Sequence, residues 1–183
     1  MNLSETLPMT RRCFFVTAGL GLAAGAVGAG EPTKESDDDL PKAALLSDGA
    51  VKTYLLVFRT GQEVMKGLLA FARKHKLHAG HLTGIGAISD ALIGYFDPEK
   101  KTYLRIRETG QHEVLSLTGN LAQYDDAPFF HVHVALGLRD GKTRGGHLFE
   151  MTVRPTVELV LTAYPKVVGR KIDPEWGLPL LDP

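Results

Sequence analysis

Three histidines in the C-terminal half of the chain have the residue type and spacing to bind a metal ion. His131 and His133 are separated by one residue in "FFHVHVALG", and His147 follows a turn and two glycines. Alternate residues of an extended chain point to the same face, so His131 and His133 share a face if they lie on a strand. Neutral imidazole is a good ligand for divalent transition metals, and three of them leave a coordination position open. The pattern predicts a divalent metal site, with zinc the expected ion.

The position of His147 depends on the register of the hairpin that joins the two histidine segments. A two-residue loop at 140–141 places His133 opposite Leu148. A three-residue loop at 139–141 places His133 directly opposite His147. A bulge at the two glycines would also bring His147 to the shared face, because glycine tolerates positive φ and close backbone approach. The sequence leaves these alternatives open.

Nearby carboxylates could orient the metal-binding imidazoles. Glu150 follows His147 on the same segment, and Asp126 precedes the segment that carries His131. Histidine ligands commonly donate their second N–H to such groups. The competing interpretation is that the three histidines are ordinary strand residues that hydrogen-bond to their neighbours. No serine or cysteine lies in a nucleophile motif, so the sequence does not establish whether the protein is an enzyme.

A sheet and one helix must position these residues. Residues 60–76 have apolar positions at helical spacing, and Thr60 and Glu63 are placed as a capping box. Seven β-type runs, separated by turn residues, surround this helix in the sequence. The pattern predicts an α+β fold with a largely antiparallel sheet of about seven strands and one main helix.

The two ends of the chain differ from this pattern. Arg11 and Arg12 precede a Gly- and Ala-rich apolar run that ends at Gly30, which is typical of a twin-arginine export signal. The alternative is an N-terminal membrane anchor, which is less favoured because a run so rich in Gly and Ala is only weakly apolar. We therefore expect a signal at 1–30, a flexible acidic linker at 31–50, a folded domain at 51–166 and an irregular C-terminal tail at 167–183. The expected location is periplasmic or otherwise extracytoplasmic.

The charge balance argues against a polyanionic partner. The chain has 183 residues, with 21 basic and 21 acidic side chains, and its formal net charge is zero. A protein that binds duplex DNA normally has a basic stripe, so nucleic acid is not the expected partner. The single cysteine, Cys13, lies within the expected signal, and thiolate ligands are therefore not expected in the exported chain.

Three segments together resemble a known family. "GIGAISDALIGYFDPEKKTY", "EVLSLTGNLA" and "HVHVALGLRDGKTRGGHL" occur in this order, and they are similar to the PPC (plants and prokaryotes conserved) domain, in its stand-alone bacterial form. The resemblance covers about residues 54–164. It implies a compact α+β fold, assembly as a homotrimer and a family label of DNA binding, which comes from plant members that carry AT-hooks. This chain lacks the Arg-Gly-Arg-Pro element of an AT-hook.

Two hypotheses of different classes follow. In the first, the protein is an exported trimer whose His131, His133 and His147 bind a divalent metal that orients a small anionic ligand or activates a water molecule. In the second, it is a non-catalytic trimeric assembly or binding module with structural histidines. DNA binding, which rests on the family label, ranks third.

Overall fold

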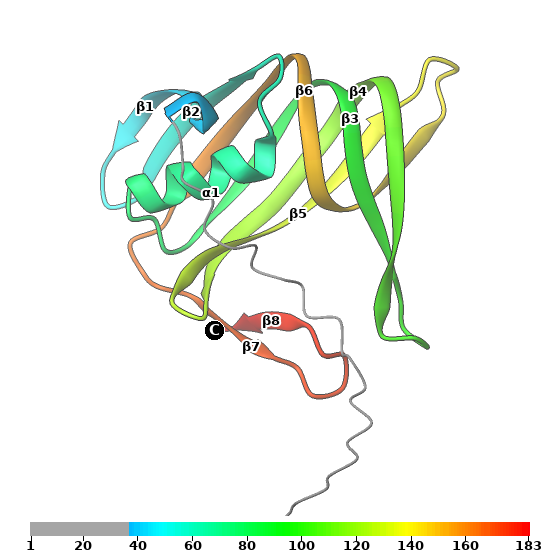
Figure 1. Cartoon of the computed structure of the whole chain (residues 1–183). Helices are drawn as coiled ribbons and strands as arrows, with labels where there is room; N and C mark the ends of the chain where they lie inside the picture. Colours follow the sequence, from blue (N-terminus) through cyan, green and yellow to red (C-terminus); the bar gives the residue numbers. More distant parts are fainter. Residues whose placement is uncertain (1–36) are drawn as a thin grey trace, which may run out of the picture. The chain divides into compact units, whose positions relative to one another are not determined.

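The structure is a computed structural model that describes residues 37–183, and the expected export signal lies outside the described residues. Long, curved strands dominate the fold, and one helix lies across the sheet (Figure 1). The elements are, in chain order, the 3-10 turn η1 (Asp37–Asp39), β1 (Lys42–Asp48), β2 (Lys52–Arg59), α1 (Val64–Lys74), β3 (Gly80–Asp97), β4 (Thr102–Tyr124), β5 (Ala127–Gly137), β6 (Thr143–Ala163), β7 (Gly169–Ile172) and β8 (Pro179–Asp182).

All the strands belong to one sheet. Its order is β1-β2-β6-β3-β4-β7-β8, and β5 pairs with both β4 and β6. Because β3 also pairs with β4 and β6, these four strands close a ring. Every pairing is antiparallel except the short contact between β4 and β7. The predicted largely antiparallel sheet with one main helix is therefore confirmed.

The predicted number of about seven strands is wrong, because the sheet has eight. Two pairs of predicted strands are continuous: 101–108 and 112–123 merge into β4, and 145–153 and 156–164 merge into β6. Turn-forming residues such as Gly110, at φ +96°, bend β4 without ending it. Three further strands, β1, β7 and β8, lie in segments where the sequence predicted none.

These additional strands correct two of the predicted boundaries. The described part of the predicted linker contains β1, which pairs with β2, and the predicted irregular tail contains the β7–β8 hairpin. Every residue of β1 is exposed. An edge strand of this kind is held by backbone hydrogen bonds, which leave no apolar alternation in the sequence.

The helix α1 begins one turn later than the predicted capping box implies. Its N-cap is Glu63, whose carboxylate accepts hydrogen bonds from the backbone N–H groups of Met65 and Lys66 at 3.1 and 2.6 Å. Thr60 donates its hydroxyl to the carbonyl of Pro155 instead.

Within the part of the chain that the structure describes, no helix is long and apolar enough to cross a membrane.

The core lies between α1 and one face of the sheet. The even-numbered residues of β5 from Phe130 to Leu136 are buried in the same apolar cluster as Leu68 and Phe71 of α1. Successive side chains of a strand point to opposite faces. The odd-numbered residues of β5, which include His131 and His133, therefore point to the face opposite α1.

Candidate metal centre

The hairpin between β5 and β6 brings the three predicted histidines together. His133 pairs directly with His147, and the pairing continues to Gly137 and Thr143. The N–H of Leu138 donates to the carbonyl of Lys142 at 2.9 Å, which closes a three-residue loop. Of the registers that the sequence left open, the structure adopts the one in which His133 faces His147.

The three imidazoles lie close together, and two of them have the nitrogen–nitrogen spacing of a metal-bound pair. One ring nitrogen from each histidine lies within 4.8 Å of the other two, and the Nε2 atoms of His131 and His133 are 3.1 Å apart. With metal–nitrogen bonds of about 2.0–2.1 Å, two nitrogens on one ion lie roughly 3.4 Å apart in tetrahedral geometry and roughly 2.9 Å apart in octahedral geometry. The observed separation falls between these values.

Burial keeps two of the imidazoles neutral. Burial is the main reason why the pKa of His131 is lowered to about 4 and that of His147 to about 3, and the charges of the neighbouring histidines and of Arg170 contribute to both shifts. Neutral imidazole nitrogens have the lone pairs that a metal ion needs. In addition, Nδ1 of His147 is buried and has no hydrogen-bond partner among the described residues. A histidine that served only packing would normally satisfy such an atom.

The two glycines before His147 have a steric role. Each lies against backbone of a neighbouring strand: a Cβ on Gly145 would overlap the carbonyl oxygen of Val134, and a Cβ on Gly146 would overlap that of Gly94. Neither glycine has positive φ. Their role is therefore to let β6 approach β5 and β3 closely, immediately before His147.

The two carboxylates predicted to orient the imidazoles, Glu150 and Asp126, do not belong to the three-histidine group. Glu150 accepts a hydrogen bond at 2.7 Å from Arg107, which also pairs with Asp90. Asp126 is exposed in the tight turn between β4 and β5, at φ 58°. Arg107 thus has two acidic partners, Asp90 and Glu150.

Sequence reasoning missed the groups that surround the histidines. The ring of Tyr103 lies 4.8 Å from that of His147, and Phe149 lies at the same distance. Arg105 lies above Phe149, and Arg170 lies above Phe129. The alternation of charge along 105–108 could have indicated Arg105, but Arg170 lies in a segment that had no recognisable pattern.

The remaining histidines of the described chain do not form a second metal-binding group. His75 packs against Phe71 with ring centroids 4.2 Å apart, and Nδ1 of His81 lies 2.7 Å from the hydroxyl of Tyr164. Among the residues that the structure describes, the only group of three potential metal ligands is His131, His133 and His147. The spacing of His75, His78 and His81 thus reflects the end of a helix and the start of a strand.

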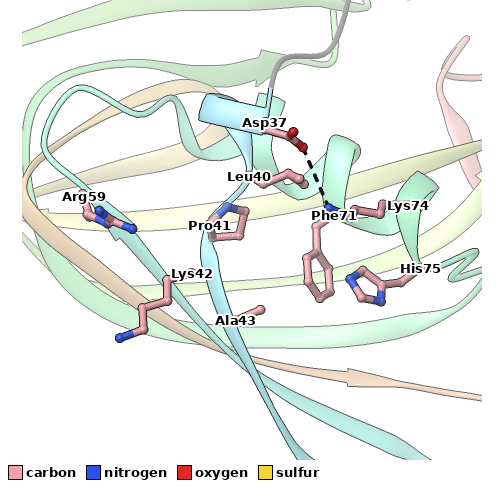
Figure 2. A pocket seen from close by; sticks show the side chains of 9 residues that line it. All are labelled: Asp37, Leu40, Pro41, Lys42, Ala43, Arg59, Phe71, Lys74 and His75. Atoms are coloured by element: carbon pink, nitrogen blue, oxygen red, sulfur yellow. Dashed lines mark ion pairs between the residues drawn. The ribbon is translucent and has the colours of Figure 1, made fainter.

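A cavity of about 320 Å³ lies apart from the histidines. Figure 2 shows its lining from η1, β1, β2 and α1, where Lys74 pairs with Asp37 above the ring of Phe71. No side chain of the histidine cluster lines it. The cavity is open and its charges are mixed, so it does not extend the candidate metal centre.

Comparison with known proteins places the chain among relatives of similar fold. The sequence model of the Plants and Prokaryotes Conserved (PCC) domain, the family also abbreviated PPC, matches residues 46–165. The bifunctional protein GlmU of Synechococcus sp. (strain JA-3-3Ab) is 32% identical over 118 residues, which are 63% of this chain and 18% of that protein. The chain thus spans about a fifth of the length of this relative.

Solved structures give the same result. A metal-containing protein from Archaeoglobus fulgidus is 33% identical, with a TM-score of 0.67 over 79% of this chain and 99% of that chain. A plant- and prokaryote-conserved protein from Pyrococcus horikoshii is 34% identical, with a TM-score of 0.68 over 78% and 95%.

A third structure bears on the expected partners. A candidate DNA-binding protein from Bacteroides thetaiotaomicron is 27% identical, with a TM-score of 0.71 over 76% of this chain and 96% of that chain. This likeness gives no support to the expectation that nucleic acid is not a partner.

Proposed function

The chain belongs to the Plants and Prokaryotes Conserved domain family, and we propose that it is an exported member that binds one divalent transition metal ion through His131, His133 and His147. The observation that carries this proposal is the convergence of three imidazoles across one hairpin, with their ligand nitrogens within 4.8 Å. The likeness to a metal-containing protein from Archaeoglobus fulgidus supports it. The arginine pair at the N-terminus supports the export part of the proposal.

Zinc is the ion that this ligand set favours. Three neutral imidazoles without a thiolate suit zinc and related ions. Residues 37–183 place no fourth ligand in the group, which leaves a position for water or a small anionic ligand. When bound, the ion would supply Lewis acidity at that position. The protein's own residues hold the three nitrogens in place: β5 supplies two of them, and the close approach of β6 at Gly146 supplies the third.

The metal content of the purified protein tests this proposal. We expect about one zinc, iron or nickel ion per chain in protein isolated after native export, measured by elemental analysis. The buried, unpartnered nitrogen of His147 is the reason to expect retention through purification. Protein that is folded and contains no metal, and that binds none on addition of zinc, would contradict the proposal.

The second candidate function is a non-catalytic homotrimeric assembly module. It is favoured by large apolar side chains on neighbouring strands, since Ile85, Leu115 and Val160 are 62%, 53% and 37% exposed. Contiguous exposed apolar surface commonly marks a protein interface. Both functions can coexist, because these side chains are distinct from the three histidines.

We expect the trimer to persist after removal of the metal. The proposed interface depends on apolar strand residues such as Ile85 and Leu115, and removing an ion from the histidines leaves these residues unchanged. Size-exclusion chromatography with light scattering, before and after treatment with a chelator, measures the mass directly. The appearance of monomers on chelation would show that the metal holds the subunits together.

A further inference from the structure

Arg170 is a buried cation without an acidic partner. Its side chain is 7% exposed, and it belongs to β7 of the C-terminal hairpin. Nη1 donates to the carbonyl of Pro179 at 2.8 Å, and Nη2 donates to the side-chain oxygen of Asn120. Nε is buried and has no partner in residues 37–183. A buried charge is costly unless an opposite charge compensates it, and no described carboxylate does so.

This cation lies beside the histidine cluster. The guanidinium carbon of Arg170 lies 4.9 Å from the ring centre of Phe129, which precedes His131 by two residues on the same face of β5. Asn120, which accepts the hydrogen bond from Arg170, is the cross-strand partner of His131. The β7–β8 hairpin therefore places the positive charge of Arg170 next to His131, the first of the three imidazoles in the sequence.

Arg105 repeats this arrangement on the other side of the cluster. Its guanidinium carbon lies 4.2 Å from the ring centre of Phe149, which follows His147 by two residues on β6. In the sheet, Gly94 lies between Arg105 and His147 and pairs with both. A Cβ on Gly94 would come within 2.6 Å of the Phe149 ring, so the absence of a side chain there allows the ring, and Arg105 above it, to lie close to His147.

Two cations near a divalent metal site oppose metal binding, unless an anion is bound as well. Like charges repel more strongly where water is partly excluded, and neither arginine forms an ion pair among the described residues that would cancel this effect. A metal ion bound by itself does not account for two positive charges so close to its site. Their positions are explained if the bound species carries negative charge.

We propose, building on the proposed metal function, that the site binds its metal cooperatively with a small oxyanion, which Arg105 and Arg170 recognise. A carboxylate or phosphate oxygen would occupy the position that the three histidines leave open. Arg105 is exposed and can donate directly to a second oxygen, as guanidinium groups commonly do. Arg170, whose terminal nitrogens donate to Pro179 and Asn120, contributes its positive charge to the recognition of the oxyanion.

Zinc affinity with and without an oxyanion tests this proposal. Zinc is titrated into the chelated full chain against a competing chromophoric chelator, in perchlorate, acetate or inorganic phosphate at equal ionic strength. We expect acetate, phosphate or both to tighten zinc binding by about tenfold, within the usual range of coupling between two sites. Tightening by acetate alone identifies a carboxylate site, and tightening by both anions identifies a general oxyanion site.

The variants Arg105→Met and Arg170→Met separate recognition from folding. In each variant we expect the oxyanion effect to fall below about threefold, while zinc binding in perchlorate becomes tighter because the repulsion is lost. Lys171→Met is the matched control: it removes a positive charge from the same strand, where Lys171 is exposed and pairs with Asp182, and it should retain the full effect.

Each outcome of this experiment is decisive. A coupling that is unchanged in both variants, or absent in the wild type, overturns the oxyanion proposal while the metal function stands. If Arg170→Met unfolds the β7–β8 hairpin, Arg105→Met still decides the question, because Arg105 lies on β4 and its side chain is exposed. A wild-type chain that binds no zinc in any of the three salts overturns both proposals.

Discussion

Replacing His131 and His133 together with alanine is expected to abolish stoichiometric metal binding. The double variant removes two of the three imidazoles and leaves His147 as the only nitrogen donor in the cluster. Because loss of a group that merely supports a metal ligand already costs about 10- to 100-fold in affinity, loss of two ligands should cost more than about 100-fold. Elemental analysis and a zinc titration of the purified variant measure this change.

The matched control is the double variant His78→Ala/His81→Ala. Both of these histidines are exposed and close to one another in the sequence. Neither belongs to the group formed by His131, His133 and His147. This control should retain the metal content of the wild type. Equal metal content in the two double variants would show that the metal binds elsewhere, and circular dichroism would establish that each variant is folded.

The second large effect is expected from Gly146→Ala. An alanine Cβ at this position overlaps the carbonyl oxygen of Gly94 on β3, so the two strands must separate. Forcing an extra methyl group into a packed region costs about 1–3 kcal/mol of unfolding free energy. Because Gly146 immediately precedes His147, the same displacement should lower zinc affinity by about 10- to 100-fold, the range for loss of a supporting group.

Thermal or urea unfolding measures the first part of this effect, and zinc titration measures the second. Gly49→Ala is the control, since a Cβ at Gly49 meets only the carbonyl of Val51 at an ordinary 3.8 Å. It should leave both stability and zinc affinity near the wild-type values. If Gly146→Ala destabilised the chain and left zinc affinity unchanged, the position of His147 would not depend on this close approach.

These predictions connect the local sequence to the proposed chemistry. The histidines supply neutral nitrogens, the glycines set the spacing of the strands, and the two arginines set the charge of the bound species. The three groups lie on β4, β5, β6 and β7. The histidine variants should therefore change metal content, the glycine variant should change stability together with zinc affinity, and the arginine variants should change the dependence of zinc affinity on an oxyanion.

Several features followed from the sequence alone because they depend on neighbouring residues. The spacing of His131 and His133 places them on one face of any strand, and the apolar positions of α1 bury Leu68 and Phe71 at helical spacing. The antiparallel sheet followed from short turns between β-type runs. The family followed from the order of three segments. The first three of these inferences depend on residues a few positions apart, and the family depends on the order of motifs along the chain, so the sequence is enough for all four.

Only the tertiary structure decided the remaining features, because they depend on contacts between distant segments. The three-residue loop selected the register that places His147 opposite His133, where the sequence allowed other registers. Glu63 caps α1 and also accepts the N–H of Met151, which lies 88 residues away. Arg170 reaches the candidate site because β7 pairs with β4, and a four-residue strand whose one buried side chain is charged leaves no apolar periodicity in the sequence. Backbone pairing and charge placement of this kind depend on the packed chain, so no single segment reveals them.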